Sequence, residues 1–372
     1  MRIVFVCNQY PTLGLCGGIG TMVQTLARGL VDAGHQVTVL GLGDSGESED
    51  RGVRLVMLPA SRLRGLAWLI NRRRLYRWLR REARGGGVDI IEISEFQGLL
   101  PFRFPWAPVV LRLHSSHIPI SWQMRWLERR TMGLHRNWIS VSEWMLMWAR
   151  RKYGQEPHRA TVVYNALLPA SIESGGGLSD SQLPAKFILY AGRVGSLKGS
   201  YVLAQAAKRL LTRFPDVDLV YAGRQTVEEG TSSGGKILQI VGEDLASRVH
   251  LLGFVEHETV LEIIARATVF VSPSQLESFS MVVLEALRAG TPVVYADAHA
   301  GPEVIRDGVT GLLADPFDPD DLADKVGQLL EDRELAARLA ENGKRDAEER
   351  FSLERCVAGT LAFYQELLEE AS

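Results

Sequence analysis

The chain has 372 residues, of which 46% are hydrophobic and 23% charged, a composition typical of soluble globular proteins that excludes a disordered or fibrous chain. A chain of this length is expected to fold as two domains. The net charge of −2 hides an asymmetry: residues 1–170 carry 23 Lys and Arg against 12 Asp and Glu, and the remaining residues carry 19 against 32. The basic first half therefore predicts an anionic partner for that half.

Neither a membrane span nor a disulfide framework is expected. No stretch approaches the ~18 consecutive apolar residues of a transmembrane helix, and the opening MRIVFVCNQYP is typical of a strand rather than a signal peptide. Cys7, Cys16 and Cys356 are too few and too scattered for a disulfide framework or a CxxC metal site. These features predict a reduced, cytoplasmic protein.

The first half begins with a βαβ unit. Residues 3–6 are an apolar, β-branched run that predicts a buried parallel strand, and residues 21–33 have the apolar spacing of a helix. Between them lies a loop with four glycines, Gly14, Gly17, Gly18 and Gly20. Further strands of this half are predicted at 37–40, 90–93, 109–113, 138–141 and 162–164.

The α/β alternation restarts after a segment with the composition of a linker, residues 170–184. Strands of the second half are predicted at 187–190, 219–221, 249–252, 269–271 and 293–295. The pattern predicts two doubly wound, Rossmann-like parallel-sheet domains, residues 1–170 and 184–350, that face a central cleft. Open sheets of this kind bind ligands at the carboxyl ends of their strands.

Two carboxylates flank the start of one helix of the second half. The helix is predicted to begin near Ser280, so Glu277 lies in the preceding loop and Glu285 inside the helix. The free N–H groups near Met281 and Val282 would form an anion site. One arrangement would use the amides and both carboxylates: a phosphate would bind the amides, a sugar would bind Glu277 and a ribose diol would bind Glu285. The alternative is a glutamate that complements the helix dipole and a second, solvated one.

A loop of the sequence AGRVGSLKG, residues 191–199, directly follows a predicted strand. Arg193 can bind two phosphate oxygens at once and Lys198 adds a point charge. The loop lacks the GxxxxGK[ST] spacing of a P-loop ATPase. The alternative is that both side chains are solvated surface cations.

Two weaker signals lie in the first half. Gly17 and Gly18 would let the backbone approach an anion or a sugar, although the loop is not a clean GxGxxG and no acidic residue closes a second strand, so an NAD site is disfavoured. His114 follows the strand at 109–113, where α/β proteins place reactive groups. The alternatives are a tight turn and a structural histidine, with His117 as a competing candidate. No spacing supports a metal site.

These motifs occur together in one known family. They are the E-x7-E element from Glu277 to Glu285, the segments 286–294, 301–305 and 308–313, and weaker landmarks at Gly17-Gly18, His114, 140–142 and 163–165. The chain thereby resembles the retaining GT-B glycosyltransferases of family 4, the group 1 class that uses nucleotide-sugar donors. The resemblance covers nearly the whole length. One departure is Ser280, where the family usually has glycine.

The resemblance implies a role for each candidate residue of the second half. Arg193 and Lys198 would bind the donor diphosphate and stabilise the leaving nucleotide. Glu285 would bind the ribose hydroxyls and Glu277 the hydroxyls of the transferred sugar. The backbone of residues 280–282 would hold phosphate and sugar.

In the first half, the resemblance places Gly18 against the diphosphate and His114 near the reacting sugar and the acceptor. The C-terminal helix, residues 352–372, would pack back onto the first domain. The family works with retention of configuration and with neither a metal nor a separate cofactor.

The expected activity is therefore that of a hexosyltransferase. It would move a hexose from a nucleotide-diphosphate sugar, with a UDP-sugar favoured, to a hydroxyl of a saccharide, a lipid-linked acceptor or a cell-envelope glycan. The alternatives are a GT-B sugar-nucleotide epimerase or phosphorylase, a non-catalytic nucleotide-sugar binding protein, and a peripheral membrane scaffold.

An arginine- and tryptophan-rich segment, residues 62–84, accounts for much of the positive charge of the first half. Trp122, Arg125, Trp126, Arg129 and Arg130 add to it. Basic amphipathic helices with tryptophans bind anionic membrane surfaces, which predicts a peripheral location on the inner face of the membrane. The alternative is a solvated helix face with its tryptophans in the core. Nucleic acid is disfavoured as a partner because no recognition motif accompanies the charge.

Overall fold

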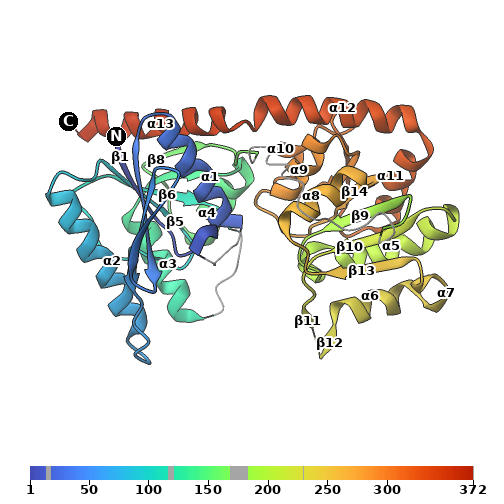
Figure 1. The fold of residues 1–372 in the computed structure, drawn as a ribbon, viewed down its shortest axis with the longest axis horizontal. Helices are drawn as coiled ribbons and strands as arrows, with labels where there is room; N and C mark the ends of the chain where they lie inside the picture. The colour runs from blue at the N-terminus through green and yellow to red at the C-terminus, as the bar shows by residue number, and fades with distance from the viewer. Residues whose placement is uncertain (14–17, 116–120, 168–182, 229, 372) are drawn as a thin grey trace. The chain divides into compact units, whose positions relative to one another are not determined.

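The computed structural model describes residues 1–13, 18–115, 121–167, 183–228 and 230–371. The chain divides into two compact units (Figure 1). Unit 1 comprises Met1–Ala166 and Ser352–Ser372, and unit 2 comprises Leu167–Phe351. Each unit contains one large, mostly parallel sheet with helices packed against it, so the predicted class of two doubly wound, Rossmann-like domains is confirmed.

Unit 1 contains a sheet with the strand order β3-β4-β2-β1-β5-β6-β7-β8. Neighbouring strands are parallel except β3 and β4. The strands are β1 (Arg2–Val6), β2 (Gln36–Gly43), β3 (Gly46–Asp50), β4 (Val53–Pro59), β5 (Ile90–Ser94), β6 (Val109–Leu113), β7 (Asn137–Ser140) and β8 (Arg159–Val162). The helices are η1 (Pro11–Leu13), α1 (Gly18–Asp32), α2 (Ala67–Arg84), α3 (Trp122–Leu134), α4 (Glu143–Tyr153) and α13 (Leu353–Ala371). The chain order reverses between β1 and β5, so their carboxyl ends form the switch point at which open sheets bind ligands.

A buried ion pair and the apolar core of unit 1 hold α13 in place. Arg112 on β6 donates to both carboxylate oxygens of Glu92 on β5, over 2.7 and 3.0 Å, and both side chains are at most 2% exposed. From α13, the Thr360 hydroxyl accepts from Arg112 over 2.9 Å and the Tyr364 hydroxyl donates to Glu92 over 2.5 Å. Tyr364 also belongs to the same apolar cluster as Phe5 of β1. The last helix of the chain is thus part of the core of unit 1.

Unit 2 contains a fully parallel sheet with the order β13-β10-β9-β14-β15-β16. Its strands are β9 (Phe187–Ala191), β10 (Asp218–Ala222), β13 (Val249–Gly253), β14 (Val269–Ser272), β15 (Val293–Ala296) and β16 (Leu312–Ala314). Its helices are η3 (Ser196–Lys198), α5 (Ser200–Arg213), α6 (Ser233–Val241), α7 (Glu243–Ala246), α8 (His257–Arg266), α9 (Met281–Ala289), α10 (Gly301–Val304), α11 (Pro319–Glu331) and α12 (Arg333–Arg350). The order reverses between β9 and β14, which brings the loops after these two strands together.

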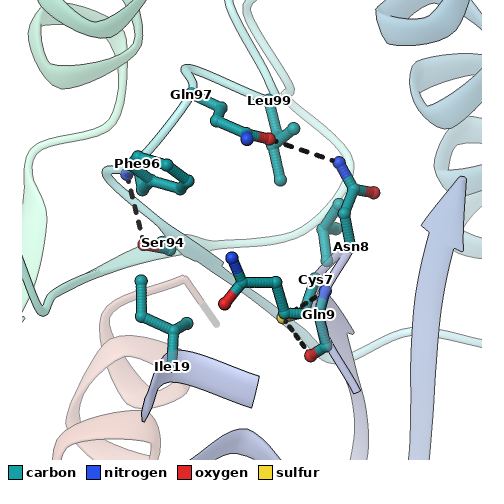
Figure 2. Close-up of a pocket in the computed structure, with 9 residues that line it drawn as sticks. Cys7, Asn8, Gln9, Ile19, Ser94, Phe96, Gln97 and Leu99 are labelled. Carbon is teal, nitrogen blue, oxygen red and sulfur yellow. Dashed lines mark hydrogen bonds between the residues drawn. The ribbon is translucent and has the colours of Figure 1, made fainter. Parts of the chain in front are cut away.

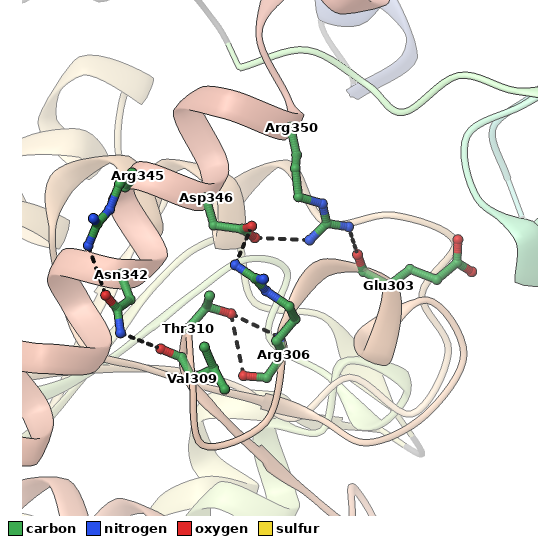
Figure 3. Close-up of polar contacts among 8 residues, drawn as sticks. All are labelled: Glu303, Arg306, Val309, Thr310, Asn342, Arg345, Asp346 and Arg350. Carbon is green, nitrogen blue, oxygen red and sulfur yellow. Dashed lines mark hydrogen bonds and ion pairs between the residues drawn. The ribbon is translucent and has the colours of Figure 1, made fainter.

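A polar network holds α12 against the turn before β16 (Figure 3). Asp346 on α12 is 6% exposed and binds Arg306 over 2.6 Å and Arg350 over 2.9 Å. Asn342 donates to the Val309 carbonyl over 3.2 Å. The segment 301–313, which carries part of the family resemblance, therefore packs against α12 and holds it in place.

The prediction of individual strands was less accurate at the edges. β3 was not predicted because its sequence, GESED, is almost entirely polar and four of its five residues are exposed, as edge strands often are. The strand predicted at 162–164 ends at Val162 in the structure. Most of the predicted linker lies outside the described residues. No helix within the described ranges is both long and apolar enough to cross a bilayer.

Candidate active site

The loops after β9 and β14 are packed directly against each other. Gly199 has a φ of 70°, and a Cβ added there would lie 1.7 Å from the Pro273 carbonyl oxygen, so no other residue fits this contact. Next to it, the Gln275 amide donates to the Leu197 carbonyl over 3.1 Å. This contact places the side chain of Lys198 beside that of Glu277.

Lys198 and Glu277 form an ion pair, with Lys198 Nζ 2.5 Å from Glu277 Oε2. Both are partly exposed, at 34% and 17% of their side-chain surface. Arg193 leaves the same loop, and its carbonyl accepts a hydrogen bond from the buried Tyr190 hydroxyl over 2.7 Å. Its own side chain is exposed, and among the described residues the guanidinium has no hydrogen-bonding or ion-pair partner. The loop thus presents one paired and one unpaired cation.

The start of α9 follows the loop after β14, and the anion site predicted there stays a prediction. Ser280 stands at the N-cap position, but its side chain makes no capping hydrogen bond. The first residues of the helix, Met281 and Val282, are partly exposed. Free amides at a helix start, together with the helix dipole, favour a negatively charged group.

Glu285 lies one turn further along α9 and is almost fully buried, with 5% of its side chain exposed. Burial raises the pKa of Glu285 to about 7, and the positive charge of Arg288 opposes this shift. His257 on α8 places its Nε2 3.5 Å from Glu285 Oε1. The sequence analysis missed His257, because it stands 28 positions away in a segment with no motif.

The two remaining predicted residues belong to unit 1. His114 directly follows β6, and burial, with the nearby charge of Arg112, lowers the pKa of His114 to about 3. The imidazole is therefore neutral across the physiological range. Its backbone N–H donates to Glu95 over 3.0 Å, and the Ser115 N–H donates to the same carboxylate over 2.6 Å. His117 lies outside the described residues.

Glu95 was not predicted, although it fixes the segment that carries His114. It follows β5, is fully buried and also accepts a hydrogen bond from the Ser94 hydroxyl over 3.0 Å. Burial raises the pKa of Glu95, and the hydrogen bonds from His114 and Ser115 oppose that shift. Its signal in the sequence was an acidic residue at the carboxyl end of a predicted buried strand.

Of the glycine-rich loop, Gly18 begins α1 and Gly17 lies outside the described residues. A Cβ on Gly18 would meet nothing within 4 Å, whereas a Cβ on Gly20 would lie 2.7 Å from the Gln9 carbonyl oxygen. Gly20 is thus the glycine that the packing of unit 1 requires. Gly18 has no such steric requirement, and its predicted contact with a diphosphate stays a prediction.

A small pocket lies at the switch point of unit 1 (Figure 2). It is lined by residues that follow β1 and β5 and by the start of α1: Val6, Cys7, Asn8, Gln9, Ile19, Ser94, Phe96, Gln97 and Leu99. The Asn8 side-chain amide donates to Gln97 Oε1 over 3.4 Å. The pocket has apolar walls and three side-chain amides, the kind of surface that binds a polar, uncharged ligand.

The comparison with known proteins identifies the family. Residues 16–167 match Glycosyltransferase Family 4, and residues 179–346 match Glycosyl transferases group 1. Together the two matches take in most of the chain. The chain belongs to the group 1 glycosyltransferases. It is therefore a glycosyltransferase, as the sequence analysis predicted.

Curated relatives and solved structures agree with this assignment along the chain. An uncharacterized glycosyltransferase of Methanocaldococcus jannaschii is 27% identical over 99% of this chain and 99% of its own. The phosphatidyl-myo-inositol mannosyltransferase of Mycolicibacterium smegmatis is 29% identical over 91% of this chain and 86% of its own. An Anabaena protein solved in complex with UDP is 20% identical and matches with a TM-score of 0.76 over 99% of this chain and 100% of its own. This group 1 glycosyltransferase thus has the GT-B fold.

Proposed function

We propose that this glycosyltransferase transfers a hexose from a nucleotide-diphosphate sugar to an acceptor hydroxyl with retention of configuration. The main supporting observation is on unit 2: Lys198 pairs with Glu277 across the loops after β9 and β14, Arg193 leaves the first of these loops, and α9, which carries Glu285, begins after the second. Cations and helix amides suit a diphosphate, and a carboxylate suits a ribose diol. The Anabaena protein was solved with UDP and with UDP-glucose, which favours a UDP-sugar here.

The charge distribution supports catalysis without a metal ion. As the bond to the diphosphate breaks, negative charge grows on the departing phosphate and positive charge on the anomeric carbon. Arg193, Lys198 and the α9 amides would stabilise this charge more in the transition state than in the ground state. These groups supply the electrostatic stabilisation that a divalent cation gives in other transferases.

Retention follows if the acceptor attacks on the face from which the diphosphate leaves. The acceptor oxygen then bonds to the anomeric carbon while the bond to phosphate breaks, and the departing phosphate oxygen takes the hydroxyl proton. Glu277 suits a sugar-binding role better than that of a nucleophile, because its carboxylate is engaged by Lys198. Neutral His114 would offer the reacting sugar a hydrogen-bonding ring without a charge.

The pocket of unit 1 supports a saccharide as the acceptor. Its side-chain amides, from Asn8, Gln9 and Gln97, can both donate to and accept from sugar hydroxyls. The Mycolicibacterium relative is named for a phosphatidyl-inositol acceptor, which favours a lipid-linked acceptor here. The same chemistry would serve a cell-envelope glycan.

Exposed apolar side chains of unit 1 support docking on an anionic membrane from the cytoplasmic side. Leu63, Leu66, Trp122 and Trp126 are 56%, 52%, 81% and 49% exposed, and we call them the apolar rim. Leu63 and Leu66 precede α2, and Trp122 and Trp126 lie in the first five residues of α3. These helices follow β4 and β6 and so begin at the carboxyl edge of the sheet. Such side chains, with cations beside them, insert at the boundary of headgroups and acyl chains.

Both helices also pack against the turn that lines the pocket. Arg72 on α2 donates to the Gly98 carbonyl over 2.7 Å, and a Cβ on Gly98 would lie 2.6 Å from the Leu127 carbonyl carbon on α3. Along α2, Arg73, Arg77, Arg80 and Arg84 are exposed. Trp78 is only 8% exposed, so for this residue the alternative of a tryptophan in the core holds. The proposed membrane contact is therefore narrower than the whole of residues 62–84.

A ligand screen followed by a turnover assay tests the proposed activity. UDP, GDP, ADP and TDP and their hexoses are added in a thermal-shift assay, in which a ligand at 100 times its Kd should add about 2.7 kcal/mol of stability. Release of nucleoside diphosphate is then followed with and without saccharide acceptors and with a chelator. Acceptor-dependent release that survives chelation, and a product with the donor's anomeric configuration by NMR, are expected. Conversion of the donor without an acceptor would instead indicate an epimerase.

Co-sedimentation with vesicles tests the membrane contact. Wild type should bind vesicles containing phosphatidylglycerol more than pure phosphatidylcholine, and less as salt rises. Trp122→Ser with Trp126→Ser should lose most of this binding. Phe254→Ser, which removes a 62% exposed apolar residue of unit 2, is the matched control. Equal binding by wild type and the double variant would contradict the proposed contact.

A further inference from the structure

The loop that carries Arg193 and Lys198 is held by a hairpin that has no role in the function proposed above. The hairpin consists of β11 (Val227–Glu228) and β12 (Thr231–Ser232), inserted between β10 and α6. The Thr226 hydroxyl, directly before β11, donates to the Val194 carbonyl over 2.8 Å. The Val194 N–H in turn donates to the Arg224 carbonyl over 3.0 Å.

Glu228, in β11 of this hairpin, contacts the loop at η3. Its Oε1 accepts the backbone N–H of Ser196, the first residue of η3, over 3.1 Å, and its Oε2 accepts the Tyr201 hydroxyl over 3.1 Å. The packing is close, since a Cβ on Gly195 would lie 2.7 Å from Glu228 Oε1. Although burial acts against the charged form, the hydrogen bonds from Ser196, Tyr201 and Thr226 lower the pKa of Glu228. The brace is therefore an ionised carboxylate at neutral pH.

The loop is held at two points. Glu228 holds it between its two cations, at the Ser196 amide two residues before Lys198, where η3 ends. The Tyr190 hydroxyl holds it at the Arg193 carbonyl. A phosphate-binding loop that is already ordered loses less conformational entropy when the ligand binds. The Ser196 amide is itself engaged by Glu228, so this amide is not available to a phosphate.

We propose that Glu228 is a positioning residue for the nucleoside diphosphate: by holding the Ser196 amide, it fixes the loop from which Arg193 and Lys198 meet the phosphates. This inference rests on the proposed function, because it takes the diphosphate of the donor as the ligand of the loop. Glu228 itself touches neither phosphate nor sugar. Its effect should therefore be confined to ligands that carry phosphates.

Calorimetric titration of the full chain with UDP and with uridine tests this confinement. Glu228→Ala should raise the Kd of UDP about tenfold, the size of one lost charge-assisted hydrogen bond. The Kd of uridine, which has no phosphate, should not change. Glu228→Gln keeps an acceptor oxygen for the Ser196 amide and should bind UDP within about twofold of wild type. If another nucleoside diphosphate binds wild type more tightly, it and its nucleoside replace this pair.

Hydrogen exchange of the peptide covering residues 192–199 gives a readout that needs no ligand, and it should be faster in Glu228→Ala than in wild type. Glu243→Ala, which removes an exposed carboxylate of α7, controls for charge. Unchanged or tighter UDP binding by Glu228→Ala, or a Glu228→Gln variant as weak as Glu228→Ala, would overturn the inference. If wild type binds no nucleoside diphosphate at all, the proposed function fails instead, and unchanged exchange would then also reject the brace.

Discussion

Replacing Lys198 with alanine should separate the catalytic role of this residue from its structural one. The Lys198–Glu277 pair is partly exposed, and such pairs contribute at most about 1 kcal/mol to stability. The change should therefore lower the free energy of unfolding by no more than about 1 kcal/mol. Loss of a cation from a leaving diphosphate costs ~2–4 kcal/mol of transition-state stabilisation, so kcat/KM should fall by ~10²–10³.

A second interpretation is that Lys198 only neutralises Glu277, whose carboxylate would otherwise repel the phosphates. Combining Lys198→Ala with Glu277→Gln distinguishes the two. If Lys198 acts on the diphosphate, the double variant should stay at least as slow as Lys198→Ala, since removing the repulsion does not replace the missing cation. If neutralisation were its main role, the double variant would regain most of the wild-type rate.

The assay for this pair of variants is release of nucleoside diphosphate at several donor concentrations, with unfolding measured in urea alongside. Lys208→Ala, an exposed lysine on α5 of the same unit, is the matched control and should leave rate and stability unchanged. A Lys198→Ala enzyme with near wild-type kcat/KM would refute the electrostatic reasoning, and Arg193→Ala offers an independent check with the same expected loss.

Three further sites give testable expectations. Donor affinity should rise with pH through about 7, because the ribose diol donates to the ionised form of Glu285; Glu285→Gln should abolish this dependence in pH-resolved titrations. Because the pKa of Glu285 is raised in the folded protein, the folded state binds more protons than the unfolded state between pH 4.5 and 7. The free energy of unfolding of wild type should therefore fall as pH rises through this window, and it should fall less in Glu285→Gln. Glu92→Gln should destabilise unit 1 by about 3–5 kcal/mol in urea, since it leaves the Arg112 charge buried and unpaired, whereas Tyr364→Phe should cost about 1 kcal/mol. Glu95→Ala removes the carboxylate that holds the backbone of His114 and Ser115. It should therefore lower kcat while changing the KM for the donor little, and unchanged kinetics would reject this positioning role.

The parts of the site that the sequence predicts are those whose position follows from local rules. Lys198 and Glu277 lie in the loops that follow β9 and β14, and in an open parallel sheet such loops share one edge. Their ion pair, however, depends on the close approach of Gly199 to Pro273, which only the folded chain establishes. The sequence motifs thus identified Lys198 and Glu277 as candidates, but their contact could be seen only in the folded structure.

The residues that the sequence analysis missed are those whose role depends on contacts with distant parts of the chain. Glu95, Glu228 and His257 act on a loop or helix far away in the sequence, through a backbone amide or a buried carboxylate. Nothing in their own neighbours signals that partner, because a hydrogen bond to a backbone amide requires no particular residue type on the other side. Such supporting residues can be found only from the coordinates of both partners.

The charges on unit 2 also predict that an intact nucleotide sugar should bind better than either of its parts alone. Lys198 is held by Glu277, so a diphosphate can gain the full attraction of this cation only by competing with that carboxylate. A sugar whose hydroxyls take over the carboxylate would release the lysine to the phosphates. The sugar thereby frees Lys198 for the diphosphate, and the diphosphate frees Glu277 for the sugar. Neither a free sugar nor inorganic diphosphate would obtain both interactions. The ion pair is thus consistent with a site that discriminates an intact nucleotide sugar from its fragments.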